Sequence, residues 1–269
     1  MISLEELREK YNPDGSELRK HQLYMLEMLQ YIDDICKKNN INYWLSSGTL
    51  LGAIRHKGFI PWDDDCDIEM LRDDYVKLLS VLEKSDDISE KYVLQTHKND
   101  EFYVMPYAKL RKIDTMVYEK GEEDLQYKYR GIFIDIFPLE RSCFIVSRIT
   151  AIIHNKLLVR LANSRLSKGN KRWMLIRMKI FLYNFLYPCI RFFFKPFFSS
   201  EVIYHTFGVP FYKKRFISDL FPLRKRMFEK KWFNTPLNYN HYLSIIYGNY
   251  MNIPQVDEIE RHFSKIEIE

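Results

Sequence analysis

The chain has 269 residues, enough for one large domain or two modest ones, and its 46% hydrophobic and 16% aromatic content excludes a largely disordered protein. Its net charge of +5 is uneven, because residues 1–140 carry −9, residues 141–200 carry +12 without one acidic side chain, and residues 201–269 carry +2. The acid-free stretch predicts an anionic partner, namely phospholipid head groups, a phosphorylated polymer or nucleic acid.

The start of the chain and its cysteines favour a cytoplasmic protein. The opening MISLEELREKYNPDG is polar and acidic and lacks the basic and then apolar order of a signal peptide. Lysines and arginines interrupt every apolar stretch before it reaches the length of a membrane span. The four cysteines form no Cys-x-x-Cys pair, so we expect reduced thiols rather than disulfides or a zinc site. They are Cys36, Cys66, Cys143 and Cys189.

Hydrophobic periodicity predicts the elements of the first seventy residues. Residues 17–39 carry apolar side chains at helical spacing and end in Lys and Asn, which predicts a helix. INYWLS at 41–46 is typical of a short strand, which Gly48 ends, and a helical turn is expected to begin at Thr49. The alternation in DCDIEM, residues 65–70, predicts a half-buried strand.

Beyond residue 70, the pattern predicts a helix at 71–84 and strands in KYVLQTH, FYVMPYAKLRKI and RGIFIDIFPL. From 148 to about 200 it is helical, basic and aromatic, with breaks expected at Pro188 and Pro196. The remainder is expected to form short helices and loops.

This order of elements predicts an α+β fold, with a small mixed sheet flanked by helices. We expect a catalytic core at 1–140. Residues 141–269 are expected to add a helical, basic portion and a C-terminal segment that completes the active-site cleft.

Residues 46–70, SSGTLLGAIRHKGFIPWDDDCDIEM, combine a glycine turn with five carboxylates. Asp65 and Asp67 lie two apart on the predicted strand, so their side chains share a face and can hold one or two divalent cations, for which Mg²⁺ is the best match. Asp135 lies in the middle of the apolar strand GIFIDIFPL, where an isolated charge is costly to bury. We therefore predict that Asp135 joins the pair as a third metal ligand.

Other interpretations of these acids stay open. Asp-rich stretches are commonly solvated turns, and a lone Asp in an apolar strand is commonly a salt-bridged core residue. An EF-hand loop that starts at Asp63 is disfavoured, because its sixth position is Ile68 rather than glycine.

The order of strand, glycine turn, Asp-x-Asp and later Asp resembles the nucleotidyltransferase superfamily. The longer wording YWLSSGTLLGAIRHKGFIPWDDDCDIEM resembles the LicD/fukutin family of phosphotransferases. The likeness extends to LEMLQYIDDICKKNNI, AKLRK at 108–112, GIFIDIFPL and YGNYM. The chain departs from the family pattern at Cys66, where an aliphatic residue is common, and at Asn249, where an Asp is usual.

The resemblance implies a nucleotidyltransferase-like fold and transfer of phosphocholine from CDP-choline to a hydroxyl of a cell-surface glycan precursor, such as lipopolysaccharide or teichoic acid, with CMP released. It implies two Mg²⁺ or Mn²⁺ ions on Asp65, Asp67 and Asp135, with Asp135 as the candidate proton acceptor. Alternatives are transfer of another phospho-alditol or of a nucleotide by the same fold, or a non-enzymatic module that binds anionic membranes.

Further residues are expected to bind the donor. The backbone at Ser47, Gly48 and Thr49 offers N–H groups to a phosphate at the start of a helical turn. The cations expected at the diphosphate are Arg55, Lys57, Lys109 and Arg111. A quaternary ammonium requires aromatic faces, and Trp62 is the candidate, with Trp44 and Tyr107 also near the motifs. Each of these residues has a plain structural alternative, as surface charge or core.

Residues 172–198, RWMLIRMKIFLYNFLYPCIRFFFKPFF, have the bulky apolar side chains and positive charge that are typical of segments that bind the surface of anionic membranes. Arg172, Arg177 and Lys179 are the charges expected to face lipid head groups. The alternative is an aromatic-rich pair of core helices. No nucleic-acid reader motif is present, so nucleic acid is not an expected partner.

Overall fold

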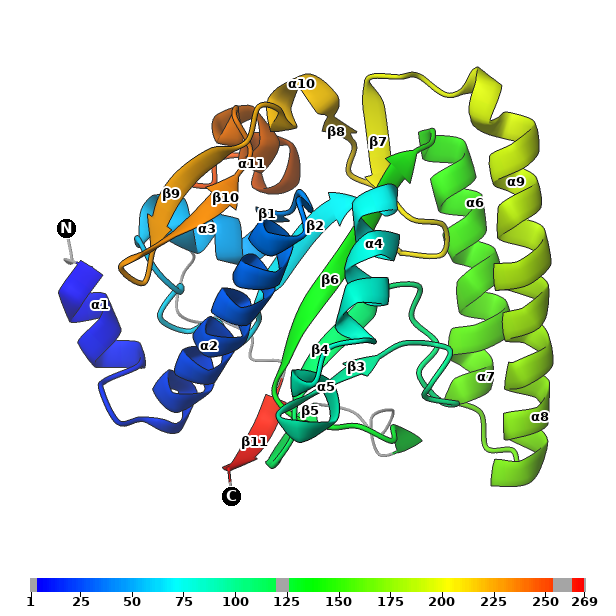
Figure 1. The fold of residues 1–269 in the computed structure, drawn as a ribbon, viewed down its shortest axis with the longest axis horizontal. Helices are drawn as coiled ribbons and strands as arrows, with labels where there is room; N and C mark the ends of the chain where they lie inside the picture. Colours follow the sequence, from blue (N-terminus) through cyan, green and yellow to red (C-terminus); the bar gives the residue numbers. More distant parts are fainter. Residues whose placement is uncertain (1–3, 120–125, 254–262, 269) are drawn as a thin grey trace.

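The computed structural model describes residues 4–119, 126–253 and 263–268. It confirms the predicted α+β architecture, with a mixed sheet flanked by helices (Figure 1). The main path of the seven-stranded sheet is β1-β2-β6-β4-β3, while β7 pairs with β6 and β8 with β7. The strands are β1 Trp44–Leu45, β2 Asp67–Leu71, β3 Tyr92–Gln95, β4 Ala108–Lys112, β6 Phe133–Arg141, β7 Val202–His205 and β8 Arg215–Phe216.

The strand β6 is the centre of this sheet. It runs parallel to β2 and antiparallel to β4 and β7. Ile134 and Ile136 are fully buried on one face of β6, which makes this strand part of the main core. Asp135 lies between them, so its side chain points to the opposite face of the sheet. The predicted boundary between residues 140 and 141 falls within β6, and β7 and β8 extend the same sheet.

Two amphipathic helices cover the Ile134 face of the sheet (Figure 1), and both were predicted. Helix α2, Glu17–Lys38, begins where the Ser16 side chain accepts a hydrogen bond from the N–H of Arg19. Its residues Met25 and Leu29 are fully buried. Helix α4, Arg72–Leu82, follows β2 directly.

The C-terminal part contains more strand than predicted. Besides β7 and β8, it forms an antiparallel hairpin of β9 and β10. The expectation of short helices and loops was therefore wrong for these segments. In β8, β9 and β10, lysines and arginines masked the strand pattern, and β7 is only four residues long. The remaining elements outside 144–197 are α1 Leu4–Tyr11, α3 Ser47–Arg55, α5 Asp87–Glu90, β5 Thr115–Glu119, β9 Arg224–Phe228, α10 Ile217–Leu220, β10 Lys231–Thr235, α11 Tyr239–Tyr247 and β11 Phe263–Ile268, which pairs with β5.

Residues 144–197 form a helical hairpin along one side of the sheet (Figure 1). Its reversal lies at 163–167, between α7 and α8. The break predicted at Pro196 is confirmed, because α9 ends at Phe194 and only a 3-10 turn follows, whereas the break predicted at Pro188 was wrong. Pro188 lies in the first turn of α9, directly after a π-helical segment, so the wider turn accommodates the proline and the helical run continues. The segments are α6 Phe144–His154, η2 Asn155–Val159, α7 Arg160–Ala162, α8 Lys168–Lys179, η3 Ile180–Leu186, α9 Tyr187–Phe194 and η4 Lys195–Phe197.

The helical hairpin packs on the loops beside the sheet through a second apolar cluster. It is built from Leu158, Leu175, Leu182 and Tyr187 of the helices together with Phe102 and Val104. Within the described ranges, every helix falls short of the length or the apolar character that a membrane span needs. The four cysteines are free, and Cys36 and Cys66 are buried.

Candidate active site

The glycine turn and the acidic strand are joined by two hydrogen bonds. The N–H of Ser46 donates to the carbonyl of Asp67 at 3.1 Å, and the N–H of Asp67 donates to Oγ1 of Thr49 at 2.8 Å. Thr49 is 2% exposed. The hydroxyl of Thr49 therefore holds the start of β2 against α3, and the backbone N–H groups of the turn stay candidates for a phosphate.

The absence of a side chain at Gly48 lets an acid approach closely. A Cβ atom built on Gly48 would lie 2.6 Å from Oδ2 of Asp63. Ser47, directly before it, has a positive φ of 45°. The turn is therefore shaped so that the Asp63 carboxylate lies directly on its backbone.

Strand pairing brings Asp67 and Asp135 together. They are register partners on the parallel strands β2 and β6, so their side chains share one face of the sheet. Lys109 is the partner of Asp135 on β4, and its Nζ lies 2.8 Å from Oδ1 of Asp135. Two carboxylates and an ammonium group thus form a row across three strands, as the sequence had led us to expect for the two acids.

The acids before β2 form a second group beside this row. Asp63, Asp64 and Asp65 can bring one carboxylate oxygen each to within 4.8 Å of one another. Asp63 was not among the predicted site residues, although its place at the head of the acid run was a signal. Asp64 is 3% exposed, and its backbone carbonyl lies 2.9 Å from Nε2 of the buried His21.

Negative charge is concentrated at Asp67. Burial removes water from the Asp67 carboxylate and raises its pKa well above the usual range. The carboxylates of Asp65, Asp135 and Asp63 raise this pKa further. The nearby Lys109 opposes this rise. Among the described residues, Asp63, Asp64 and Asp65 are the group whose carboxylate oxygens converge, and Asp67 with its partner Asp135 adjoins this group. An all-oxygen donor set is the kind that Mg²⁺ or Mn²⁺ prefers, so the acids of this region fit the expected ions.

A hollow of about 530 Å³ opens beside the acids. Gly48, Arg55, Trp62 and Asp63 of the signature segment line one side of it. The other side is formed by the end of α11 and the segment that follows it, namely Tyr247, Asn249, Tyr250, Asn252 and Ile253. Segments almost two hundred residues apart in the sequence therefore share this cleft.

The predicted cations lie in different places. Arg55 lines the cleft and donates to the carbonyls of Tyr250 at 2.9 Å and Asn252 at 2.8 Å. Lys57 is exposed and lines a separate hollow.

Arg111 lies inside the protein. It is 1% exposed and donates to Gln95 at 2.6 Å and to the carbonyl of Gly131 at 2.8 Å. Its place favours a structural role. Lys109, paired with Asp135, is the predicted cation that lies within the row of acids. Trp62 lines the cleft but is only 8% exposed, with its ring edge-on to that of Tyr11.

Glu69 is the centre of a buried network that sequence reasoning did not identify. The carboxylate lies 3.0 Å from Arg215 and 3.1 Å from His205, and it accepts from Tyr242 at 2.6 Å and from the indole of Trp44 at 3.2 Å. These partners hold the pKa of Glu69 below its usual range despite complete burial. The network ties β2 to β1, β7, β8 and α11 beneath the acids.

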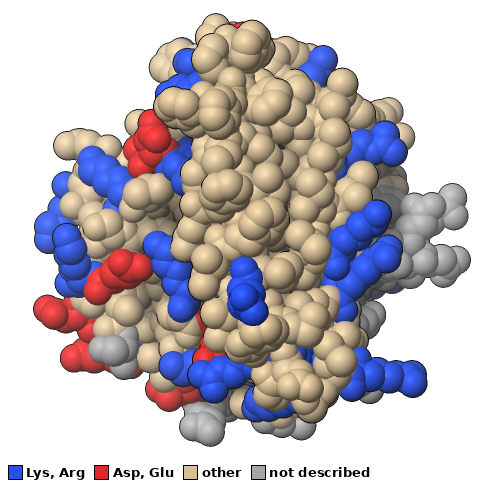
Figure 2. Space-filling view, turned by 90° about the vertical axis from the view of Figure 1, so that its right-hand side faces the viewer, with Lys and Arg blue, Asp and Glu red and all other residues tan. Residues whose placement is uncertain are grey.

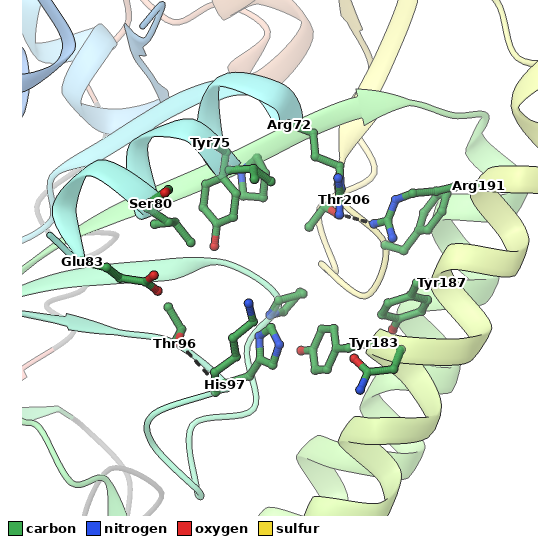
Figure 3. Close-up of a pocket in the computed structure, with 17 residues that line it drawn as sticks. Arg72, Tyr75, Ser80, Glu83, Thr96, His97, Tyr183, Tyr187, Arg191 and Thr206 are labelled. Carbon is green, nitrogen blue, oxygen red and sulfur yellow. Dashed lines mark hydrogen bonds between the residues drawn. The ribbon is translucent and has the colours of Figure 1, made fainter. Parts of the chain in front are cut away.

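A hollow of about 380 Å³ lies between α4, the helical hairpin and the loops beside β3 (Figure 3). Arg72, Tyr75, His97 and Arg191 line it. Pro138 also lines it, three residues along β6 from Asp135 and hence on the opposite face of the sheet. None of the predicted site residues lines this hollow, so it is separate from the acids.

Comparison with known proteins agrees with the geometry. Residues 40–159 match the family of LicD/FKTN/FKRP nucleotidyltransferase domains. The chain is 28% identical to the lipopolysaccharide cholinephosphotransferase LicD of Haemophilus influenzae over 263 residues, which cover 91% of this chain and 95% of that protein. It is 40% identical to the human ribitol 5-phosphate transferase FKRP over 48 residues, 18% of this chain and 10% of that protein. Residues 40–159 therefore match a LicD-type nucleotidyltransferase domain, and the chain as a whole is similar to LicD along most of its length.

Proposed function

We propose that this protein is a phosphotransferase that moves phosphocholine from CDP-choline to a hydroxyl group of a cell-surface glycan precursor and releases CMP. The observation that carries the proposal is the row of Asp67, Asp135 and Lys109 beside the cleft at Gly48 and Asp63. The similarity to a lipopolysaccharide cholinephosphotransferase along nearly the whole chain supports the choice of group and acceptor.

The acids are proposed to hold divalent cations. Asp65, Asp67 and Asp135 are the proposed ligands, with Asp63 as a further candidate because it lies against the turn. Bound Mg²⁺ would offset the negative charge of the diphosphate and of the leaving phosphate.

The protein's own groups position the reaction. The acceptor hydroxyl forms a bond to the choline-bearing phosphorus while the bond from that phosphorus to the oxygen of CMP breaks. Asp135 is the proposed acceptor of the hydroxyl proton, and Lys109 is placed beside it to bind a phosphate oxygen. The backbone at Ser47, Gly48 and Thr49 is proposed to bind the diphosphate, with Arg55 at the wall of the cleft.

A second candidate function is transfer of another phospho-alditol. The specific observation that favours it is the similarity of 48 residues to a ribitol 5-phosphate transferase. Both functions use the same acids, so the donor alone distinguishes them.

A thermal-shift titration tests the proposal. CDP-choline should raise the melting temperature only with Mg²⁺ present, and CDP-ribitol should have little effect. The variants Asp67→Asn and Asp135→Asn should lose both this shift and CMP release. Asp34→Asn, at an exposed position of α2, should keep both. Unchanged CMP release by Asp67→Asn would refute a role of the acids, and a larger shift with CDP-ribitol would favour the second candidate.

A further inference from the structure

The outer face of the helical hairpin is apolar over most of its length. Along α6, Ile145, Ile149 and Ile152 are spaced by four and three residues and are 42–66% exposed, so they form one stripe. Figure 2 shows this side of the molecule, where a broad band without charged residues fills the upper and middle part, and a basic side chain lies within its lower part. The other large apolar residues exposed in 144–197 are Phe144, Leu166, Trp173, Met174, Ile176, Ile180, Phe181, Phe185, Phe192, Phe193, Phe194 and Phe197.

The helical hairpin buries two lysines, Lys171 and Lys179, while it exposes these rings. Lys179 is 7% exposed, and its Nζ donates to the carbonyls of His97 at 3.2 Å, Asp100 at 3.0 Å and Glu101 at 2.7 Å. Phe192 and Phe197, in contrast, are 78% and 82% exposed. The prediction that Lys179 faces lipid was therefore wrong. The outer face is therefore apolar even though the helices contain polar residues.

Basic residues border this apolar band (Figure 2). Because residues 141–200 contain no acid, every charged side chain of the helical hairpin is positive. The guanidinium of Arg177 lies 4.4 Å from the ring of Trp173, at the junction of the apolar and basic areas. A second copy of the chain would bring like charges together, whereas an anionic surface would neutralise them.

A basic hollow of about 410 Å³ opens next to the exposed phenylalanines. Its charged lining consists of four cations and two carboxylates, so the hollow is positive on balance. They are Arg72, Arg141, Arg191, Lys195, Asp73 and Glu140. Arg191 is already neutralised by Glu140, to which it donates at 2.5 and 2.7 Å. Burial and the charge of Arg191 lower the pKa of Arg72, as expected where positive charge is in excess. The hollow suits a phosphate group at the border of the apolar band.

We propose that the helical hairpin docks on an anionic lipid bilayer, with the rings of Phe192–Phe197 among the upper parts of the lipid chains and a lipid phosphate in the hollow at Lys195. Exposed aromatic residues beside lysines and arginines are the composition of interfacial helices that lie on a membrane. The acids of the candidate site lie on β2, on β6 and in the segment before β2, and not in the helical hairpin. This inference does not depend on the proposed transferase activity.

Vesicle flotation of the full chain tests the proposal. At low salt, the protein should float with vesicles of phosphatidylcholine mixed with phosphatidylglycerol and much less with phosphatidylcholine alone. Trp173→Glu should lower the bound fraction several-fold. Trp232→Glu provides the matched control, because Trp232 is 57% exposed, close to the 59% of Trp173, but lies on β10 away from the helical hairpin.

A second pair of variants tests the hollow. Arg141→Gln with Lys195→Gln should weaken the preference for anionic vesicles, while the equally conservative Lys225→Gln with Lys231→Gln on the β9–β10 hairpin should not. Absence of flotation by the intact chain would overturn the proposal. So would equal losses in Trp173→Glu and Trp232→Glu, or a dimer in sedimentation that Trp173→Glu dissociates, since a second copy would then cover the face.

Discussion

The residues around the glycine turn divide into those that shape the site and those that can touch a ligand. Thr49 has its hydroxyl occupied by the N–H of Asp67, and Gly48 leaves room for Asp63. The sequence pattern pointed to Gly48, to Thr49 and to the acid run that begins at Asp63. It could not separate the residues that shape the site from those that can touch a ligand. That distinction depends on where β2 starts, because Asp65 lies before the strand and Asp67 begins it.

Two glycines of α3 should respond differently to the same substitution. Gly48→Ala places a methyl group 2.6 Å from the end of the Asp63 side chain, which can rotate away, so the melting temperature should change little while affinity for Mg²⁺ falls. Gly52→Ala meets the backbone carbonyl of Gly58 at 2.5 Å, which cannot move without the loop, so this variant should unfold several degrees lower. Thermal denaturation and calorimetric titration with Mg²⁺ measure both effects. Equal destabilisation by the two variants would contradict this account of the turn.

Removal of the Thr49 hydroxyl should destabilise the protein. Thr49→Val keeps the side-chain shape but leaves the N–H of Asp67 without its acceptor, at a cost of about 1–3 kcal/mol. Thr49→Ser retains the hydroxyl and should lose much less. The free energy of unfolding in urea measures both variants, and equal losses would mean that the methyl group rather than the hydrogen bond matters.

At the scale of elements, local periodicity was enough to predict α2, α4, β2 and β6, because each has a clear apolar face or an apolar run. Local periodicity did not predict where the first half of the helical hairpin ends. The reversal at 163–167 contains no proline, while Pro188 lies where a π-helical turn absorbs it. Proline marks a break only when the preceding turn cannot widen, and this depends on packing.

The attachment of the helical hairpin should weaken in mild acid. His154 on α6 is 1% exposed, with Nδ1 3.0 Å from the hydroxyl of Tyr187 and Nε2 2.9 Å from the carbonyl of Val104. Burial lowers the pKa of His154 to about 4, whereas the unfolded chain titrates near 6.5. Between these values the unfolded state binds more protons, so stability present above pH 6.5 is lost as the pH falls towards 4.

This loss is measurable by urea denaturation. Because of His154, the free energy of unfolding should fall by roughly 2 kcal/mol between pH 7 and pH 5. His154→Gln lacks this group, so its free energy of unfolding should depend less on pH. His97, whose pKa burial lowers to about 3, should retain its own share of the dependence. An unchanged pH profile in His154→Gln would show that His154 takes up its proton without loss of packing.

At the scale of the whole molecule, contacts across long sequence separations assemble the site, and these were the least predictable part. The pairing of Asp67 with Asp135 was inferred from the resemblance and from the cost of a lone buried acid, and the register of β2 and β6 agrees with it. Three of the partners of Glu69, namely His205, Arg215 and Tyr242, lie more than a hundred residues away in the part that was expected to form short helices and loops. No local pattern indicates such partners, since a buried ion pair is specified by packing and not by periodicity.

The buried carboxylate of Glu69 should therefore be among the most sensitive positions of the fold. Glu69→Gln leaves the 3% exposed Arg215 without its counter-charge, which should cost about 3–5 kcal/mol, because a buried charge is then uncompensated. Glu229→Gln breaks the comparable but more exposed pair with Arg19 and should cost less, since water can replace the lost partner. Adding Arg215→Met to Glu69→Gln should recover part of the loss, because the remaining charge is removed as well. Denaturant unfolding of the unchanged chain and these three variants measures the differences. If Glu69→Gln lost less stability than Glu229→Gln, water would reach the network, and β2 would be held to the C-terminal part by packing alone.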